Sequence, residues 1–278
     1  MRHAGTAALL VLTLSLGALA QDAPSQVDAL YRPLDQILDI YVRDGFVYYN
    51  ALKIERGGLD RFVASLDGPA AVAQAKGTPA QQRAFWINAY NALVLRTVID
   101  NYPIRGRSSA YPVGSVRQIS GAFERLTHRV AGRTVTLDGI EKDILVPLGD
   151  PRVFLALGRG AIGGGRLRSE ALDADTLDAQ LERIAAESLT RKEVIRVDQS
   201  TNQLEVSPIF SWREEAFVAG LADKAHKVFA ARSPLERAVL ALIGPHLLTS
   251  EAEFLEKNDF KMVFSAFDWR INDLGNRP

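Results

Sequence analysis

The sequence contains no cysteine in its 278 residues. Disulfide bonds, thiol catalysis and attachment of a lipid to a cysteine are therefore excluded, and stability must come from an ordinary hydrophobic core. Histidine is also scarce, with four residues scattered along the chain. No two of them stand at ligand spacing on one helix face, so the sequence predicts no metal site.

The chain lacks an excess of charge of either sign, because 33 Lys and Arg balance 33 Asp and Glu. It also has no basic stripe with interleaved aromatic residues, which argues against a nucleic acid as a partner. A hydrophobic content of 47% is typical of a globular protein.

Long apolar runs are missing as well, and the N-terminal one is short. A basic start at Arg2 precedes an apolar stretch over residues 7–16 and a small-residue site that ends at Ala20. This pattern predicts a secretory signal peptide, residues 1–20, whereas a retained anchor needs about 20 apolar residues. We therefore expect cleavage after Ala20, a periplasmic or extracellular location without membrane attachment, and a single globular domain over residues 21–278.

The strongest structural signal lies between Thr78 and Pro103. Thr78 and Gln81 can form a capping box, Pro79 suits the first helical position, and Pro103 disfavours further helix. The residues between them are apolar on nearly every face, which indicates burial. The sequence thus predicts a buried central helix over residues 78–101.

Other segments mix helices with short antiparallel pairs. Alternating residues around turns predict hairpins at 128–136 and 194–206, apolar runs predict a buried strand at 153–157, and alternation predicts a closing strand at 261–271. Periodic or capped segments predict helices at 25–42, 59–66, 69–76, 177–184, 211–221 and 233–243 and from 250. An extended piece is expected at 46–49. Without a regular strand–helix repeat, this pattern indicates an α+β fold.

Two carboxylates in apolar surroundings, Glu141 and Asp268, are the candidate catalytic residues. Glu141 has a structural alternative as the capping-box partner of Asp138 at a helix start. Asp268 lies between two aromatic residues on the predicted closing strand. It either forms an ion pair with an arginine such as Arg152 or has a function.

Two asparagines of the central helix, Asn88 and Asn91, lie one turn apart on the same face. A buried amide must find hydrogen-bond partners. These side chains therefore either tie down neighbouring loops or line a polar pocket, for which Arg152 is a further candidate.

A glycine-rich loop follows the predicted strand at 153–157. Gly158, Gly160 and Gly163 fit the pattern GxGxxG, in which glycines let a phosphate approach the backbone at a helix N-terminus. However, no helix opens directly from this loop, and no acidic residue follows at the required distance. A tight or mobile loop is the alternative interpretation, and no cofactor is expected.

The order of these motifs resembles the domain of unknown function 547 (DUF547), over about residues 27–274. The most specific piece is the Trp-Ile-Asn-Ala-Tyr-Asn sequence at 86–91. The pieces that carry the resemblance lie at 45–49, 84–93, 137–141, 150–153, 207–212 and 267–269.

The resemblance also has departures. The family typically carries a histidine, a cysteine and a Ser-Cys-Pro after its Asp-Pro-Arg, where this chain has Phe154, Arg159 and three glycines at 163–165. Arg213 and Ala216 stand where the family has tyrosine and aspartate. The resemblance therefore implies a retained scaffold with a rebuilt loop that cannot perform thiol chemistry.

These observations favour an exported, non-catalytic domain that binds an envelope or extracellular partner or a small ligand. One alternative is a hydrolase or transferase that uses carboxylates and asparagines in a cleft beneath the loop at 158–165. Nucleotide binding at that loop is a third hypothesis.

Overall fold

The structure, a computed structural model, describes residues 28–276. It has the predicted α+β fold, with helices and three small sheets. The helices are α1 (Arg32–Tyr41), α2 (Tyr49–Ile54), α3 (Gly57–Ser65), α4 (Pro69–Ala75), α5 (Pro79–Asn101), α6 (Leu137–Gly139), α7 (Leu177–Leu189), α8 (Ile209–Trp212), α9 (Glu214–Leu221), α10 (Pro234–Ile243) and α11 (Thr249–Glu256). The strands are β1 (Val42–Arg43), β2 (Phe46–Val47), β3 (His128–Val130), β4 (Arg133–Val135), β5 (Ile195–Asp198), β6 (Gln203–Val206) and β7 (Lys261–Phe264). The predicted signal peptide lies outside the described residues.

Helix α5 is the buried centre of the fold, as the sequence predicts. Its capping box is present: the Gln81 amide donates to Thr78 Oγ1 at 3.3 Å, and Gln81 Oε1 accepts from the Thr78 amide at 2.8 Å. Buried side chains occur on every face of its central turns. Helices α2, α3 and α4 pack against it, so its apolar surface is covered by tertiary contacts.

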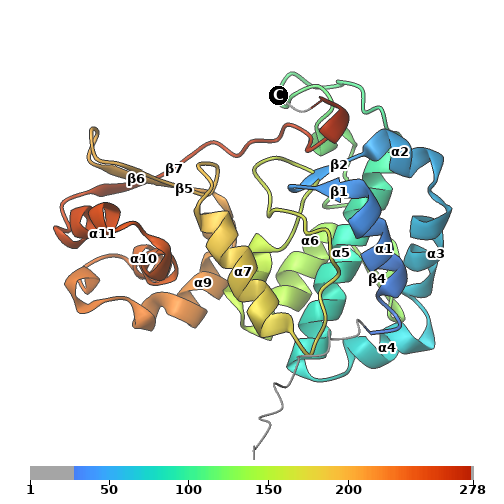
Figure 1. Cartoon of the computed structure of the whole chain (residues 1–278), viewed down its shortest axis with the longest axis horizontal. Helices are drawn as coiled ribbons and strands as arrows, with labels where there is room; N and C mark the ends of the chain where they lie inside the picture. The colour runs from blue at the N-terminus through green and yellow to red at the C-terminus, as the bar shows by residue number, and fades with distance from the viewer. Residues whose placement is uncertain (1–27, 277–278) are drawn as a thin grey trace, which may run out of the picture.

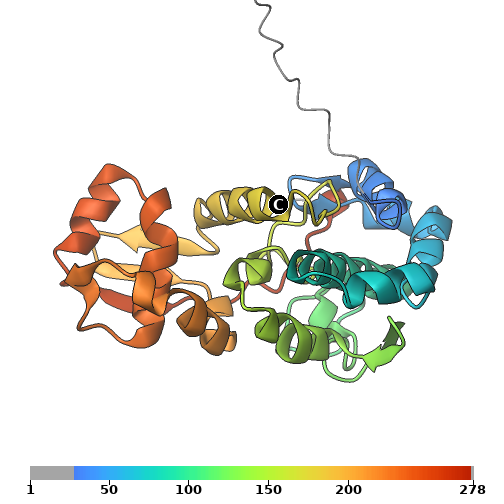
Figure 2. The ribbon, with the colours of Figure 1, turned by 90° about the horizontal axis from the view of Figure 1, so that it is seen from below.

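The remaining elements are arranged in two parts beside each other (Figures 1 and 2). One part contains α5 surrounded by α1 to α4 and α6. The other contains α9 to α11 and the sheet β5–β6–β7, and α7 lies between them. Among the described residues, no helix combines the length and apolar character needed to cross a bilayer.

Both predicted hairpins are confirmed, since β3 pairs with β4 and β5 with β6 in antiparallel register. The predicted closing strand is wrong in extent. β7 runs parallel to β6 and ends at Phe264, where its partner strand ends at Val206. The chain then crosses back to the other part, where isolated bridges join Ile271 to Ala161 and Asp273 to Val47.

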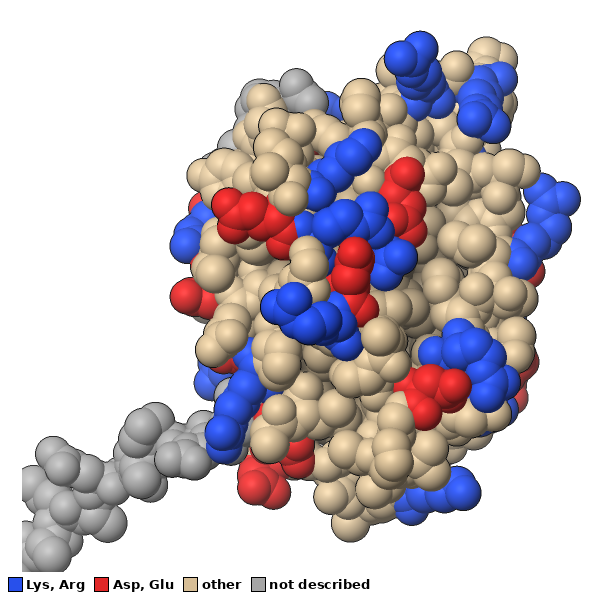
Figure 3. Space-filling model, turned by 90° about the vertical axis from the view of Figure 1, so that its right-hand side faces the viewer, with Lys and Arg blue, Asp and Glu red and all other residues tan. Residues whose placement is uncertain are grey.

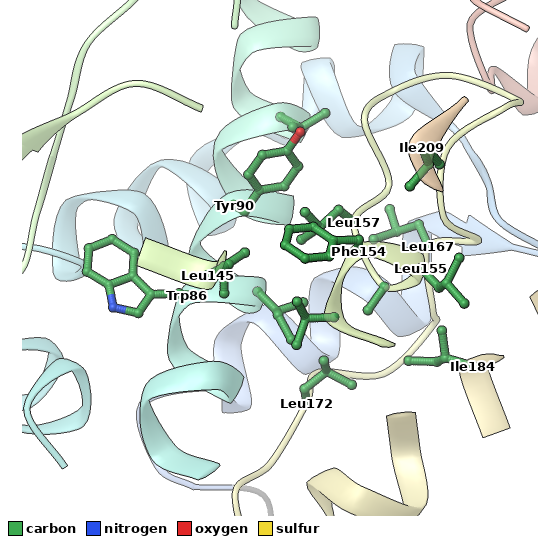
Figure 4. Packing of buried hydrophobic residues seen from close by; sticks show 14 of the residues in the cluster. Trp86, Tyr90, Leu145, Phe154, Leu155, Leu157, Leu167, Leu172, Ile184 and Ile209 are labelled. Atoms are coloured by element: carbon green, nitrogen blue, oxygen red, sulfur yellow. The ribbon is translucent and has the colours of Figure 1, made fainter. Parts of the chain in front are cut away.

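The predicted strand at 153–157 is also wrong. Residues 151–155 form a 3₁₀ helix, η4 (Pro151–Leu155), whose start is capped by Asp150 through the Arg152 amide at 3.1 Å. A short apolar run fits a buried helix turn as well as a strand, so periodicity alone could not separate them. Figure 4 shows Phe154 packed among Leu155, Leu157 and Leu167 beside Tyr90 of α5.

Two helix starts differ from the sequence pattern. Helix α1 begins at Arg32 rather than at the predicted residue 25. Residues before 28 are not among those that the structure describes. Of the extended piece predicted at 46–49, only Phe46–Val47 is a strand, because Tyr49 already opens α2.

Charged side chains are interspersed on the surface. On the face shown in Figure 3, basic and acidic residues lie next to one another rather than in blocks of one sign. This distribution agrees with the equal numbers of basic and acidic residues in the sequence.

Candidate functional site

Glu141 occupies a π-helical turn, η2 (Ile140–Leu145), that continues from α6. The cap of this segment is Thr136, whose Oγ1 accepts from the Gly139 amide at 3.0 Å. The predicted capping box of Asp138 and Glu141 is therefore wrong, and both carboxylates have other partners. Such π turns are rare and often occur at functional sites.

The Glu141 carboxylate is buried and receives hydrogen bonds from three side chains. Arg159 Nη2 lies 2.7 Å from Oε2, and Arg213 donates to the same oxygen from Nη2 at 2.8 Å and from Nε at 3.1 Å. The Tyr90 hydroxyl of α5 donates to Oε1 at 2.6 Å. Because the accepting carboxylate is ionised, all of these hydrogen bonds are charge-assisted, which makes them stronger than hydrogen bonds between neutral groups.

Arg159 is held in this position by an unusual backbone. Its φ is +45°, a left-handed conformation that residues other than glycine rarely adopt. Its side chain is 2% exposed, and Nη1 donates to the carbonyls of Phe154 at 3.2 Å and Leu157 at 3.4 Å. The guanidinium is thus satisfied by one carboxylate and two main-chain oxygens.

The charges determine the protonation state of this group. Burial alone raises the pKa of the Glu141 carboxyl, but the positive charges of Arg159 and Arg213 reverse this effect and leave the pKa below its usual value. Burial, together with the nearby Glu141 charge, raises the pKa of the Tyr90 hydroxyl. Glu141 is therefore ionised and Tyr90 neutral at physiological pH.

This cluster forms the floor of a cleft of about 440 Å³. The volume lies in the range of small-molecule sites, about 300–1,000 Å³. The cleft brings together segments that are far apart in the sequence. Its lining consists of Arg117, Phe123, Glu124, Asp138, Glu141, Lys142, Arg159, Trp212, Arg213 and Trp269.

Aromatic side chains form one wall of the cleft around Trp269. Trp212 is nearly parallel to Trp269, with ring centres 6.0 Å apart and planes at 21°. Phe267 lies 4.3 Å from the Trp269 ring centre and 4.9 Å from that of Trp212. The Arg117 guanidinium lies 4.6 Å from the ring centres of both Phe123 and Trp269, a cation–π geometry.

Comparison with known proteins finds a family model that is similar to part of the chain. Residues 75–189 match the family model described as "Protein of unknown function, DUF547". This part of the chain is therefore similar to DUF547. No curated protein and no solved structure matches the chain.

The DUF547 match includes α5, Glu141 and Arg159 and ends before Arg213 and Trp269. Two departures that the resemblance identified, Arg159 and Arg213, contact the same oxygen of Glu141. Two of the rebuilt positions of this DUF547-like chain therefore belong to one ion-pair cluster.

Asn88 and Asn91 do not line the cleft. The Asn88 amide exchanges two hydrogen bonds with the main chain of Leu172, at 2.7 and 2.9 Å. Asn91 donates to the Ala156 carbonyl at 3.0 Å and accepts from the Gly158 amide at 2.9 Å. Both amides tie loops to α5, which was the structural alternative for them.

Asp268 and Arg152 do not contact Glu141. They also do not pair with each other, because each has its own ion-pair partners. The structural alternative for Asp268, an ion pair with an arginine, is confirmed, but the partner is its neighbour Arg270 at 2.5 Å and not Arg152. Burial raises the pKa of Asp268, but hydrogen bonds from Arg270 outweigh it and lower the pKa. Arg152 instead pairs with Asp150, Asp178 and Glu182 at 2.9, 2.6 and 3.2 Å.

The glycine-rich loop is a tight, buried turn. The amides of Gly163, Gly164 and Gly165 donate to the carbonyls of Asp268, Ala161 and Leu157 at 2.9, 3.1 and 2.8 Å. These donors are therefore not free to hold a phosphate. A β-carbon on Gly163 would lie 2.8 Å from the Asp268 amide nitrogen, so this glycine lets the segment that carries Trp269 pass close by.

Gly158 and Gly160 serve the same turn. A β-carbon on either would meet only side chains, at 3.3 to 3.6 Å for the nearest atoms, and Gly160 has a φ of +62°. The geometry thus favours the tight-loop alternative over nucleotide binding. In the described part of the chain, no group of three or more His, Asp or Glu could hold a metal ion.

Reasoning from the sequence did not find the cationic and aromatic members of the cleft. In the sequence, Arg159 and Arg213 stand out only as departures from the DUF547 pattern. That both are arginines was the available signal for a shared anionic partner. Trp212 and Trp269 lie within motifs of that pattern, but the sequence does not show that they are neighbours. Only Glu141 among the predicted site residues lines the cleft.

Proposed function

We propose that this DUF547-like chain is an exported, non-catalytic binding protein of the cell envelope whose ligand sits in the cleft above Glu141. The supporting observation is that Arg159 and Arg213 hold the Glu141 carboxylate by hydrogen bonds of 2.7 to 3.1 Å. An efficient general base needs a pKa near the operating pH. The lowered pKa of Glu141 makes it a weak base.

Among the described residues that line it, the cleft also lacks a hydroxyl, thiol or imidazole nucleophile from Ser, Thr, Cys or His. Covalent catalysis of the serine or cysteine type, which needs such a group next to a base, is therefore not available in the cleft. Lys142 is the remaining amine, and it lies 2.5 Å from Asp138 in an exposed ion pair.

The alternative of a hydrolase or transferase has less support. It requires Glu141, Asp268, Asn88 and Asn91 around one substrate, within hydrogen-bond reach. The amides of both asparagines are instead bonded to main-chain atoms elsewhere.

The proposal can be tested with a panel of peptide, ester and glycan substrates at neutral pH. We expect no turnover by the wild-type protein above that of a Glu141→Gln variant with the same far-ultraviolet circular dichroism. Turnover that disappears in this folded variant would show that the cleft is catalytic and would overturn the proposal.

Export rests on the predicted signal peptide at residues 1–20. It is tested by expressing the full chain in a Gram-negative host and sequencing the N-terminus of the protein recovered from the periplasm or medium. We expect Gln21 as the first residue. An intact Met1 in a protein that stays inside the cell would contradict export.

A further inference from the structure

We infer that the ligand of the cleft is an acidic saccharide, with a sugar ring against Trp212 and Trp269 and a carboxylate near Lys142 and Arg117. This inference rests on the proposed function and specifies its ligand class.

The aromatic wall provides a surface for a sugar ring. Trp212 is 39% exposed, an uncommon position for a side chain of this size. It is also rigid, because Phe267 and Trp269 pack against it with ring centres 4.9 and 6.0 Å away. A flat, immobile indole offers a large contact area at low entropic cost, and the C–H face of a pyranose fits such a ring.

The polar groups around this wall suit hydroxyl groups. Asp138 accepts from Lys142 and, at 3.4 Å, from Arg213, and Glu124 accepts from Arg117, whereas a carboxylate has about four acceptor positions. Both carboxylates therefore retain acceptor capacity for sugar hydroxyls. An aromatic carboxylate such as benzoate has no hydroxyl groups that could donate hydrogen bonds to these two carboxylates.

The charge balance of the cleft favours an anion. Its lining has four cationic side chains, Arg117, Lys142, Arg159 and Arg213, against three carboxylates. On the floor, Arg159 and Arg213 share Glu141, and Arg213 also contacts Asp138 at 3.4 Å, so the excess is the one net positive charge of the whole lining. A cationic ligand would add to this excess, whereas one carboxylate on the ligand offsets it.

Two side chains at the rim can bind that carboxylate. Lys142 is 55% exposed and uses one of its three donors on Asp138. Arg117 is 26% exposed on its side chain and pairs with Glu124 through Nη1, which leaves further guanidinium N–H donors, although its Nε is buried. Glu124 and Asp138 lie beside them, which disfavours by repulsion a phosphate chain, whose negative charges are closely spaced.

The test is calorimetric titration of the wild-type protein with three probes. They are trigalacturonate, the same trisaccharide with its carboxyl groups reduced to alcohols, and benzoate. We expect the reduced trisaccharide to bind at least about tenfold more weakly than trigalacturonate, the size of one modest ionic contact. Benzoate should bind more weakly than either.

Variants at exposed positions locate the binding. We expect Trp212→Ala to weaken both trisaccharides, and Lys142→Gln to weaken only trigalacturonate, by about tenfold. The matched controls are Phe264→Ala, an aromatic residue exposed at 48%, and Lys227→Gln, an exposed lysine of the other part of the chain. Both should bind like the wild type.

Each contrary outcome has a distinct meaning. Equal binding of both trisaccharides, unaffected by Lys142→Gln, would overturn the acidic requirement and leave a binding protein. Tighter binding of benzoate would overturn the saccharide class. Failure of all three probes would overturn this inference alone, whereas cleavage of trigalacturonate would overturn the proposed function.

Discussion

Arg159 Nη2 lies 2.7 Å from Glu141 Oε2, and the two side chains are 2% and 3% exposed. This contact joins the buried glycine-rich loop to the π turn η2, and Arg213 joins it from the segment between α8 and α9. The floor of the cleft is therefore a buried ion-pair cluster that fixes three separate segments.

Removing the guanidinium of Arg159 should destabilise the protein strongly. We expect Arg159→Met to lower the free energy of unfolding by about 3 kcal/mol, because loss of one partner leaves a buried charge less well compensated. Arg196→Met should cost less than about 1 kcal/mol, since Arg196 pairs with Glu205 on the surface and is 51% exposed. Urea unfolding at pH 7 measures both. Equal losses would show that the buried pair adds no more than the exposed one.

The Glu141 carboxylate should make stability depend on acid pH. Its pKa in the folded protein lies below the usual value of about 4.3, so the folded state binds fewer protons than the unfolded state in this range. The stabilisation is complete above about pH 4.3 and is lost as the pH falls through the folded pKa. Glu141→Gln should therefore be less stable than the wild type at pH 7 and show a shallower decline in acid.

This prediction is measured by thermal unfolding between about pH 3 and pH 7. Glu253→Gln, at an exposed glutamate of α11, is the matched control and should follow the wild-type curve. A Glu141→Gln curve parallel to the wild type throughout would contradict the assignment.

The glycines of the buried loop should not tolerate a side chain. A β-carbon on Gly165 would lie 2.1 Å from the Leu155 carbonyl oxygen, and the backbone would have to move. We expect Gly165→Ala to cost about 3 kcal/mol or more, the upper range for overpacking. Gly244→Ala is the control, because nothing lies within 4 Å of a β-carbon there and its φ is −47°. Differential scanning calorimetry compares the two, and a stable Gly165→Ala protein would refute the close packing.

Asn91 should behave as a structural tie rather than a ligand-binding residue. Asn91→Ala leaves the Ala156 carbonyl and the Gly158 amide without their partner. Two buried unpaired groups should cost about 3 kcal/mol. Asn50→Ala, at an exposed asparagine of α2, should change stability little. Unchanged stability of Asn91→Ala with weaker saccharide binding would reverse this assignment.

Local signals in the sequence predicted the elements whose stabilising contacts are themselves local. The capping box of Thr78 and Gln81, the proline at 103 and the apolar residues between them locate α5 almost to the residue. The two hairpins were predicted because alternation and turn residues lie within a few positions of one another. The α+β class follows from the mixture of these elements.

Local signals failed where a distant partner decides the conformation. The closing strand ends at Phe264 because β6 offers no further residues to pair with, and no property of residues 265–271 reveals this. The apolar run at 153–157 is a 3₁₀ turn because Asp150 and Pro151 start it and the core covers it. The hydrophobic periodicity of a segment does not show where its partner strand ends or which residues cover it.

The sequence by itself determined the central helix, the absence of thiol chemistry and the positions at which the chain departs from the DUF547 pattern. Only the tertiary structure decided that two of those departures, Arg159 and Arg213, meet on Glu141 beneath Trp212 and Trp269. The physical reason is that a buried charge must be compensated by whichever groups the fold brings within a few ångströms. Those groups come from segments that nothing in the sequence order connects.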